Sequence, residues 1–477
     1  MIRVAASSSL TELERFAMDL LVDQSRLLVL DADTPDVVVV SDVGTERQGS
    51  AQLATWARTE SFDRADARVG IPRALLRRVG AIASTLAEQR TDAVDRFGRV
   101  PTSVNEAYSA GVARDPIVSR CAIALRKAVL EVAGRRPVAL LQPWPDGHRW
   151  GAALTHDLDV VEWWPAFTAL RIAELTSKSE WRLIGRVLAA LPLALRGNPV
   201  HRGIESILSA ERDAHVQSSW YVLSGAPTLA SMRRGDLTYR LDATLTKRIL
   251  AAIEMGAHEI GLHGSFDTML SADAFDEQRR RLQSMTSSDV RGVRQHYLRM
   301  RPGRTQRCMR QAGFTYDATF GFPDVNGFRL GVADVVTHFD AEDGVFNAFD
   351  RVPLVWMDRT VSKYQRIEQP AKWIEDARQL AEVCAEVEGL WVGLWHTNVT
   401  TPLGYPEGEQ AYRSLLSMLR ERGPFIAPLA EIVEWRRRRR RARAVAVDER
   451  GLPVASRDTA AAPPPLEHVS GAALEWA

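Results

Sequence analysis

Short apolar runs alternate with amphipathic stretches over most of the chain after residue 150. Apolar runs of this length predict buried strands, and stretches with apolar residues at every third or fourth position predict helices that cover them. The repeated order of strand and helix indicates a parallel sheet, and so many repeats in a row favour a (β/α) barrel over an open sheet. The predicted strands are 151–159, 218–225, 258–265, 290–299, 314–322, 351–358, 390–398 and 423–431.

The first 145 residues have a different pattern. A valine-rich strand is predicted at 36–42, and an amphipathic helix at 71–90. The stretch 140–150 contains Pro and Gly and is predicted to be a linker. We therefore expect an α/β protein, with a small α/β accessory domain (1–145) preceding a distorted (β/α) barrel (146–435).

Two further segments depart from the strand and helix alternation. Residues 436–477 begin with an arginine run and end in an Ala- and Pro-rich stretch, which predicts a disordered tail. The arginine run is expected to be a solvated helix end, and weak contact with an anionic membrane surface or polymer is the alternative. Residues 181–197 are apolar but too short to span a membrane, so we expect a helical insertion packed on the barrel; a membrane-surface helix is the alternative.

Composition restricts the class of protein. The chain has 477 residues, is 45% hydrophobic and 25% charged, and has a formal net charge of +1, which is typical of a globular protein and gives no reason to expect a nucleic-acid partner. Its three cysteines have neither disulfide-framework nor zinc-site spacing. Acidic residues Glu12 and Glu14 interrupt the start, where a signal peptide would be apolar. We expect a cytoplasmic location.

Ionisable residues gather where the predicted strands end. Asp157 and Asp159 are two residues apart in an extended segment, so their side chains point to the same side. Two neighbouring carboxylates repel each other unless a cation or an arginine lies between them. A turn that begins a helix is the alternative for this stretch. His156 points the other way and is expected to be a packing residue.

Other predicted strand ends supply complementary groups. His263 and Asp267 are four residues apart, a spacing that lets both reach one metal ion if a turn or short helix follows. Arg294 and Tyr297 lie at the end of the next predicted strand, and His396 ends a later one. A metal cluster, a carboxylate base, an arginine and a histidine acid together predict metal-assisted hydrolysis.

These residues fall in motifs that resemble a known family. The order THDLD (155–159), HEIGLHGSFD (258–267), RQHY (294–297) and LWH (394–396) is similar to that of the polysaccharide deacetylases, the NodB-like carbohydrate esterases. The likeness is strongest to a divergent bacterial branch with a THDVD-type first motif. It covers about 151–434, and the segment DRFGRVP (95–101) is similar to that branch as well.

The resemblance implies roles for the residues of the first three motifs. In the first motif it implies a catalytic base at Asp157 and a metal ligand at Asp159. The second motif implies metal ligands at His263 and Asp267. The third implies that Arg294 orients the base and that the backbone N–H of Tyr297 binds the oxyanion.

The last motif completes the implied site. His396 matches the general acid, and Asp317 or Asp358 would orient it. Leu394 and Trp395 are expected to shape the pocket for the acyl group.

The chain also departs from the family pattern. His296 replaces the usual Pro of the third motif, and a site of two carboxylates and one imidazole makes manganese, iron or cobalt as plausible as zinc. We expect a divalent-metal hydrolase that removes an acetyl group from an N- or O-acetylated sugar in bacterial surface polysaccharide metabolism. The alternatives are an amidohydrolase acting on a non-sugar amide and a catalytically silent scaffold or carbohydrate-binding protein.

Overall fold

A computed structural model describes most of the chain, and every structural statement below refers to these residues. They are 2–5, 9–29, 37–42, 62–65, 67–136, 138–161, 181–189, 199–237, 239–400, 405, 407–442, 444–447, 453–455 and 466–469, with a few isolated residues between 169 and 192.

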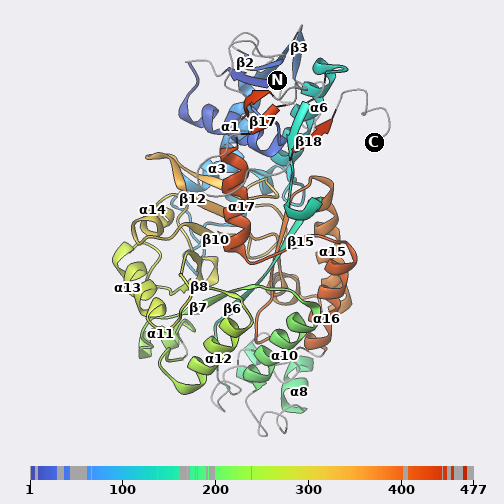
Figure 1. The fold of residues 1–477 in the computed structure, drawn as a ribbon. Helices are drawn as coiled ribbons and strands as arrows, with labels where there is room; N and C mark the ends of the chain where they lie inside the picture. The colour runs from blue at the N-terminus through green and yellow to red at the C-terminus, as the bar shows by residue number, and fades with distance from the viewer. Residues whose placement is uncertain are drawn as a thin grey trace.

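The main sheet has ten strands and is mostly parallel (Figure 1). Its hydrogen-bonded path runs β11-β12-β10-β9-β8-β7-β6-β14-β13, with β15 also paired to β6 and β11 joined antiparallel to β12. The strands are β6 (Gly151–Leu158), β7 (Ser219–Leu223), β8 (Glu259–Gly264), β9 (Gly292–Gln295), β10 (Tyr316–Phe320), β11 (Val336–Asp340), β12 (Gly344–Pro353), β13 (Trp356–Met357), β14 (Leu390–Leu394) and β15 (Phe425–Ile426).

The described strand pairs form a path with two ends, whereas a distorted (β/α) barrel was expected. β12 pairs with β10, and β13 pairs with β14 on the far side of the sheet. Leu354 and Val355 connect these two strands directly, and their N–H groups donate to Phe320 and to Val392 respectively, both at 3.0 Å. The chain therefore runs from β12 to β13 at the place where hydrogen bonds between two neighbouring strands would close a barrel.

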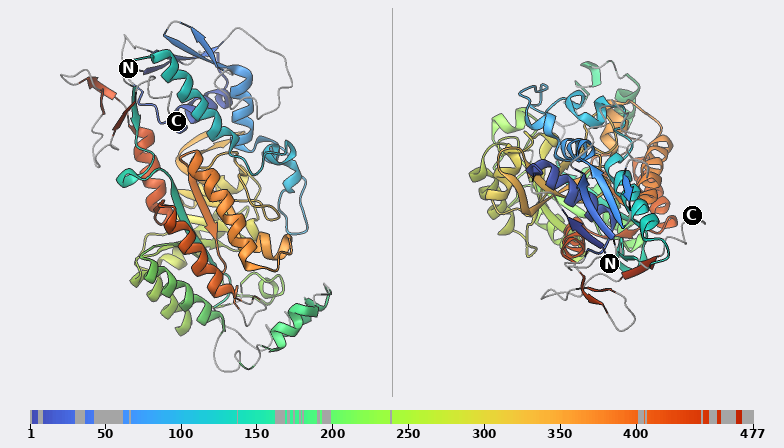
Figure 2. Two further views of the ribbon diagram at one scale, coloured as in Figure 1. Left: turned by 90° about the vertical axis from the view of Figure 1, so that its right-hand side faces the viewer. Right: turned by 90° about the horizontal axis from the view of Figure 1, so that it is seen from above.

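Helices cover the outer side of this sheet (Figures 1 and 2). Their apolar faces and the outward side chains of the strands form one large hydrophobic core, with Leu154, Trp220 and Ile260 on the strand side. The covering helices are α10 (Pro199–Ala214), α12 (Thr244–Met255), α13 (Ala272–Gln283), α14 (Arg304–Gln311), α15 (Pro370–Glu386) and α16 (Gly408–Glu421), whereas the short helix α11 (Leu229–Arg233) leaves its apolar residues Leu229 and Met232 exposed.

Strand β6 shows how the sheet separates packing from chemistry. All eight of its residues are buried, as expected for a parallel strand covered on both faces. Ala152 and Leu154 belong to the outer core, whereas Ala153 belongs to the inner one. Thr155 and Asp157 continue the inner row toward the carboxyl end of the strand, because side chains alternate between the faces of a sheet.

A second sheet of four strands lies at one end of the molecule, near both chain termini (Figure 1). Its order is β1-β2-β4-β3; helices α3 and α6 pack against it, and α1 packs on these two helices and on β11 and β12. Their core also includes Phe320, Val336 and Phe339 of the main-sheet region, so the two parts share apolar packing. The elements are β1 (Ile2–Ala5), α1 (Glu12–Ser25), β2 (Val37–Asp42), β3 (Asp63–Ala65), β4 (Arg68–Pro72), α3 (Arg73–Ser84), α4 (Leu86–Gln89), α5 (Glu106–Ser109) and α6 (Ile117–Ala133).

The arginine run does not form a solvated tail. Helix α17 (Leu429–Arg441) contains most of it, and Arg436 and Arg439 are buried. Arg436 pairs with Asp334 at 2.6 Å and lies 3.6 Å from Asp23 of α1. The expected solvated end is wrong for these residues, because acidic side chains from distant segments surround them.

Two other expectations differ from the structure. Helix α8 (Trp181–Ala189) stands away from the body (Figure 2) and leaves Trp181 66% and Leu188 47% exposed, so the described part of 181–197 is not packed as expected. In the expected disordered tail, β16 (Ala444–Val447) pairs with β17 (Pro453–Ala455), and β18 (Leu466–Val469) pairs with β5 (Val138–Leu141). The rest of 442–477 lies largely outside the described residues.

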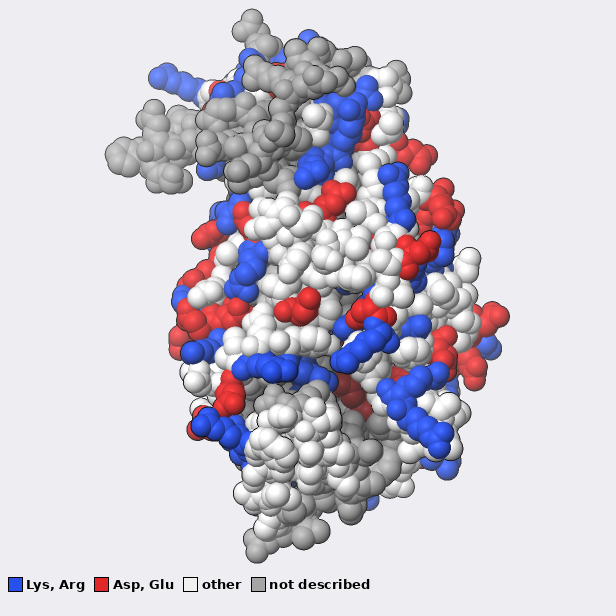
Figure 3. Space-filling view, turned by 180° about the vertical axis from the view of Figure 1, so that it is seen from behind, with Lys and Arg blue, Asp and Glu red and all other residues white. Residues whose placement is uncertain are grey.

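The surface carries both signs of charge. On the face opposite to that of Figure 1, basic and acidic side chains are interspersed over the described part (Figure 3). Among the described helices, none combines the length and apolarity that a membrane crossing needs.

Candidate active site

The carboxyl ends of the main-sheet strands surround a cleft of about 280 Å³. Its lining comes from segments far apart in the sequence. Asp157, Asp159, His263, Tyr297 and His396, all predicted from the sequence, line this one cleft. Parallel strands place their carboxyl ends at the same edge, which explains the convergence.

Asp157 is held by a buried arginine. The Arg294 guanidinium donates from Nη1 to Asp157 Oδ1 at 2.9 Å and to Thr155 Oγ1 at 3.0 Å. Its Nε donates to the carbonyl of Ala318 at 3.0 Å, and the group lies over the Tyr221 ring, 4.4 Å from the centroid. Arg294 is fully buried, so these contacts fix one orientation of the Asp157 carboxylate.

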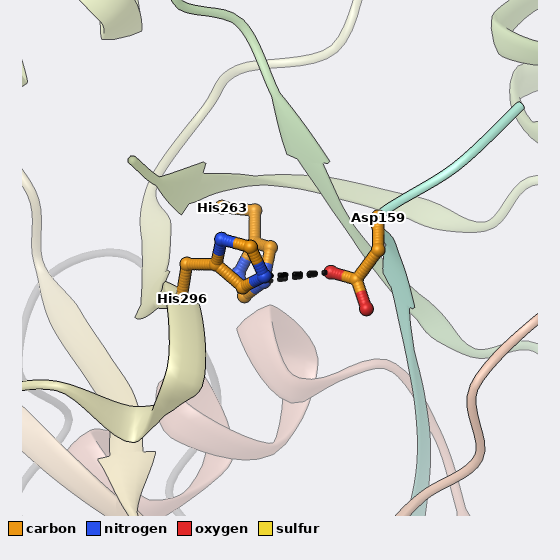
Figure 4. A group of neighbouring side chains, drawn as sticks. All are labelled: Asp159, His263 and His296. Atoms are coloured by element: carbon orange, nitrogen blue, oxygen red, sulfur yellow. Dashed lines mark ion pairs between the residues drawn. The ribbon is translucent and has the colours of Figure 1, made fainter. Parts of the chain in front are cut away.

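Asp159, His263 and His296 form a compact cluster beside it (Figure 4). Asp159 Oδ1 lies 3.2 Å from His263 Nε2 and 3.5 Å from His296 Nε2. One ligand atom from each of the three lies within 4.8 Å of the others. One carboxylate and two imidazoles are a common donor set for zinc and for other divalent transition metals.

Both imidazoles are oriented from behind. His263 Nδ1 lies 2.9 Å from the carbonyl of Arg294, and this carbonyl can only accept, so the hydrogen is on Nδ1. His296 Nδ1 lies 2.7 Å from Oδ1 of the buried Asp236. Partners at Nδ1 direct the lone pair of each Nε2 toward the cluster, as in established metal sites.

The cluster attracts positive charge. Burial by itself would lower the pKa of His263, but the negative charges of Asp157 and Asp159 raise it. Burial would raise the pKa of Asp159, but the neighbouring imidazole of His263 and the charges of His296 and His396 hold it well below its usual range. The Asp159 carboxylate therefore stays ionised and favours a proton or a cation beside it.

His396 faces the cleft from β14 and is oriented by Asp358. Asp358 Oδ1 lies 2.6 Å from His396 Nδ1, and Oδ2 accepts from the His396 backbone N–H at 2.8 Å. His396 Nε2 points to the cleft, 4.0 Å from Asp159 Oδ2. Of the two candidates for orienting His396, Asp317 and Asp358, it is Asp358 that contacts the imidazole.

Asp317 is a structural residue instead. Its side chain is fully buried and accepts hydrogen bonds from Gln306 Nε2 at 2.8 Å and from the Thr319 backbone at 2.8 Å. Burial raises its pKa. Asp317, the other candidate for orienting His396, does not contact it, because its carboxylate is occupied by local partners.

Asp267 also differs from the expectation. Strand β8 ends at Gly264, and the turn that follows leaves the Asp267 side chain 65% exposed, where it pairs with Arg234 at 2.9 Å. It belongs neither to the cluster nor to the cleft lining. His296, from the position where the family usually has Pro, lies in the cluster instead.

The N-terminal part of the chain supports Tyr297. Tyr297 has a left-handed backbone conformation (φ 62°), and its hydroxyl donates to the carbonyl of Gly235 at 2.7 Å. Its ring stacks on that of Phe97 with centroids 5.5 Å apart. Arg299 Nε donates to the Phe97 carbonyl at 2.9 Å, and Gly98 has a φ of +76°, which favours glycine.

Two residues of the motifs point away from the cleft. Trp395, expected in the acyl pocket, packs in the outer core against Trp356 and Tyr412; only Leu394 lines the cleft. His156 is a packing residue, as strand alternation predicts: Nδ1 lies 2.8 Å from the Trp395 carbonyl and Nε2 lies 3.0 Å from Glu211 Oε1.

Several functional candidates were missed from the sequence. Asp236 lies in a loop whose local pattern resembles an ordinary turn. His296 was noticed only as a replacement for Pro. The pairing of His263 with Arg294 in neighbouring strands β8 and β9 places His296 near His263, because the register ends at Gln295, one residue before His296.

Comparisons with known proteins were informative only at the level of structure. No protein-family profile and no curated protein matches the sequence. A Mycobacterium smegmatis protein assigned as a polysaccharide deacetylase is similar, with 20% identity, a TM-score of 0.41 and coverage of 66% of this chain and 97% of that chain. PuuE allantoinase has 14% sequence identity and a TM-score of 0.41, with coverage of 62% of this chain and 92% of that chain. A CE4 family pseudoenzyme from Bacillus anthracis has 11% sequence identity and a TM-score of 0.32, with coverage of 59% of this chain and 65% of that chain. These identities and TM-scores are low, so the proposed function is based on the site geometry.

Proposed function

We infer that this protein is a divalent-metal-dependent hydrolase that removes an acetyl group from an N- or O-acetylated sugar, of the kind found in bacterial surface polysaccharides and their precursors. The supporting observation is the convergence in one cleft of three elements. These are the Asp157–Arg294 pair, the cluster of Asp159, His263 and His296, and the Asp358–His396 pair. Together they match the parts required for metal-assisted hydrolysis.

The three residues of the cluster fit a divalent cation. The hydrogen on His263 Nδ1 leaves Nε2 as a lone-pair donor, and Asp236 holds His296 in the matching orientation. A cation bound here would polarise the acyl carbonyl and acidify a water molecule. With His296 in place of Asp267, the donor set is less anionic than expected and suits zinc as well as iron or cobalt.

The chain's own residues provide the proton transfers. Asp157, fixed by Arg294, would accept the proton of the attacking water. The backbone N–H of Tyr297 would donate to the oxyanion of the tetrahedral intermediate. His396, oriented by Asp358, would donate a proton from Nε2 to the leaving nitrogen or oxygen, and the bond from the acyl carbon to that atom then breaks.

The remaining cleft lining suits a small acyl group. Leu298, Pro323, Met357 and Leu394 are apolar residues of the lining. A methyl group among them would lose its contact with water at little structural cost. An acetyl group therefore fits this apolar part of the lining better than a charged acyl group would.

A comparison of two variants tests the metal site. We expect purified protein to bind about one equivalent of Zn²⁺ or Co²⁺, His296→Ala to weaken binding by at least about a hundredfold, and Asp267→Ala to leave it unchanged. Calorimetric titration measures the affinity of each protein for the metal, and metal content after dialysis measures the stoichiometry. Loss of the metal in Asp267→Ala but not in His296→Ala would disprove the proposed ligand set.

Acetate release tests the reaction. Metal-loaded protein should release acetate from N-acetylglucosamine derivatives or from O-acetylated sugars, and a chelator should stop it. Metal binding without release from any acetylated sugar, but with hydrolysis of non-sugar amides, would favour an amidohydrolase. Absence of both metal binding and hydrolysis would favour a scaffold or binding protein.

A further inference from the structure

Helix α8 (Trp181–Ala189) presents a row of apolar positions to the solvent. Trp181, Gly185 and Leu188 are spaced by four and three residues, so they lie along one side of the helix. The Trp181 and Leu188 side chains are exposed, and a Cβ at Gly185 would meet none of the described residues within 4 Å. Apolar side chains that gather on an exposed surface often mark a contact site.

The adjacent side of the same helix is basic. Arg182 and Arg186 are four residues apart, so they form a second row, and both are exposed. The sequence 181–197 contains three arginines and no acidic residue. Val187 is buried, so the helix also has a side that packs. Helix α8 therefore combines a packed side with an apolar and a basic side that are both exposed.

An apolar row beside a basic row matches the boundary of an anionic lipid bilayer. In a helix bound at this boundary the apolar side lies among the acyl chains, tryptophan is favoured at the interface, and arginine reaches the lipid phosphates. A soluble polyanion would use the arginines but not Trp181 and Leu188. An uncharged protein surface would use these two residues but not the arginines. A lipid surface is the partner that uses both rows.

The segment that contains α8 is attached at the edge of the sheet where the cleft lies. It begins after β6, where Asp159 and Val160 line the cleft, and it ends at the start of α10. Gly203, in the second turn of α10, packs closely on the backbone of Thr397, next to His396. Helix α8 lies at the end of the molecule opposite to the four-stranded sheet (Figure 1). A bilayer bound at α8 would therefore face the main-sheet part of the molecule.

We propose that α8 is a membrane-surface helix that binds an anionic lipid bilayer through Trp181 and Leu188 and through Arg182 and Arg186. The described helix has nine residues, far fewer than the about 20 that span a bilayer, so it lies in the plane of the surface. The inference goes beyond the proposed hydrolysis and does not depend on it, because lipid binding is measured without turnover.

Vesicle flotation with the full chain tests the proposal. The vesicles contain phosphatidylcholine alone or equal parts of phosphatidylcholine and phosphatidylglycerol. At about 0.1 M NaCl we expect about tenfold or more tighter binding to the anionic vesicles, and a severalfold weaker affinity at about 0.5 M NaCl, because salt screens the arginines. Trp181→Ser combined with Leu188→Ser should weaken binding about tenfold or more, and so should Arg182→Gln combined with Arg186→Gln.

Matched double variants exclude a general effect of apolarity or charge. Tyr108→Ser with Leu270→Ser removes an aromatic residue and a leucine that are exposed outside α8. Arg280→Gln with Arg291→Gln removes two exposed arginines outside α8. Both should bind anionic vesicles as the parent protein does. Thermal unfolding verifies that each variant is folded, which we expect because every substituted side chain is exposed.

The possible outcomes separate lipid from other partners. Binding to anionic vesicles that both α8 double variants lose and both controls retain would support the inference, whether or not any sugar is deacetylated. Equal binding to neutral and anionic vesicles, or binding that survives in the α8 variants, would overturn it. Absence of binding would also overturn it, and a dimer that Trp181→Ser with Leu188→Ser dissociates in analytical ultracentrifugation would then assign the apolar row to a contact between two copies of the chain.

Discussion

Asp157 separates proton transfer from metal binding. Asp157→Asn keeps the shape of the side chain but removes its basicity, so acetate release should fall by about a hundredfold or more while the metal stays bound. Initial rates and metal content measure the two effects. Asp213→Asn, at an exposed site on α10, is the control and should retain full activity. An Asp157→Asn variant with the normal rate would show that another group is the base.

Asp236 is predicted to tune the metal site from behind. Without its carboxylate, His296 loses the partner of Nδ1, and metal affinity should fall by about 10- to 100-fold in Asp236→Ala. Asp236→Asn, which retains an acceptor oxygen, should give a smaller loss. Competition with a chromogenic chelator provides the affinities. The exposed Asp242, which pairs with Arg240, offers the control Asp242→Ala; equal losses in both would argue against the role of Asp236.

Among single residues, the sequence correctly predicts the cleft position of those that lie at or directly after the end of a strand. Asp157, Asp159, Arg294 and His396 lie at or just beyond strand ends, and alternation gives their direction. The choice between Asp267 and His296 depends on how the chain turns after β8 and on which strand lies beside it. Neither is encoded in the spacing of His263 and Asp267, because a four-residue interval brings side chains together only if a helical turn follows.

Among the connecting segments, 95–99 is predicted to position Tyr297. Phe97→Ala removes the ring that stacks on Tyr297, so we expect kcat to fall about tenfold with little change in KM or metal affinity, because a displaced backbone N–H stabilises the transition state less well. Phe97→Tyr, which keeps the ring, should restore most of the rate. A purely structural role would instead lower the thermal midpoint in proportion to the activity.

Helix α1 is attached to α3 by a buried carboxylate. Burial alone would raise the pKa of Glu14, but hydrogen bonds from Arg73, the Thr11 backbone and Arg77 lower it to about 2. Its unfolded value is near 4.5, so the ionised carboxylate stabilises the fold above that pH and loses this effect as the pH falls toward 2.

We expect Glu14→Gln to lower the free energy of unfolding at pH 7 by about 2 kcal/mol, less than the full pKa shift implies because Arg77 is half exposed. Urea unfolding at pH 7, 5 and 3 should show a weaker acid dependence in the variant than in the parent protein. Identical acid dependence would exclude Glu14 as its origin.

The apolar runs in the sequence predicted where most main-sheet strands lie, but not which strands pair with each other. The predicted strand 351–358 is divided between β12 and β13, because Leu354 and Val355 turn the chain from one neighbour to another. Strand β11 was not predicted; its sequence VTHFD mixes polar and apolar residues, and it is stabilised by antiparallel pairing with β12. Such pairing between strands is a tertiary property that a local pattern does not contain.

For the whole molecule, the contact of Asp334 with α17 is predicted to be a main stabilising element. Asp334→Ala would leave Arg436 and Arg439 buried without this carboxylate, and removal of one member of a buried ion pair costs about 3–5 kcal/mol. Chemical unfolding of the parent protein and of Asp334→Ala measures this loss of unfolding free energy. Asp213→Ala breaks an exposed pair with Arg413 and should cost less than about 1 kcal/mol. Equal costs would show that the buried network adds little.

The arginines of α17 also bear on how the molecule matures during synthesis. Arg439 donates to the Asp23 carbonyl at 3.3 Å, although the two residues are 416 positions apart in the sequence. Asp23 of α1 is translated 416 residues before Arg439, one of its permanent partners. The Asp23 carboxylate therefore stays in contact with water until residues 436–441 have been translated. A nascent chain stalled before residue 436 would retain an N-terminal part that proteases attack readily.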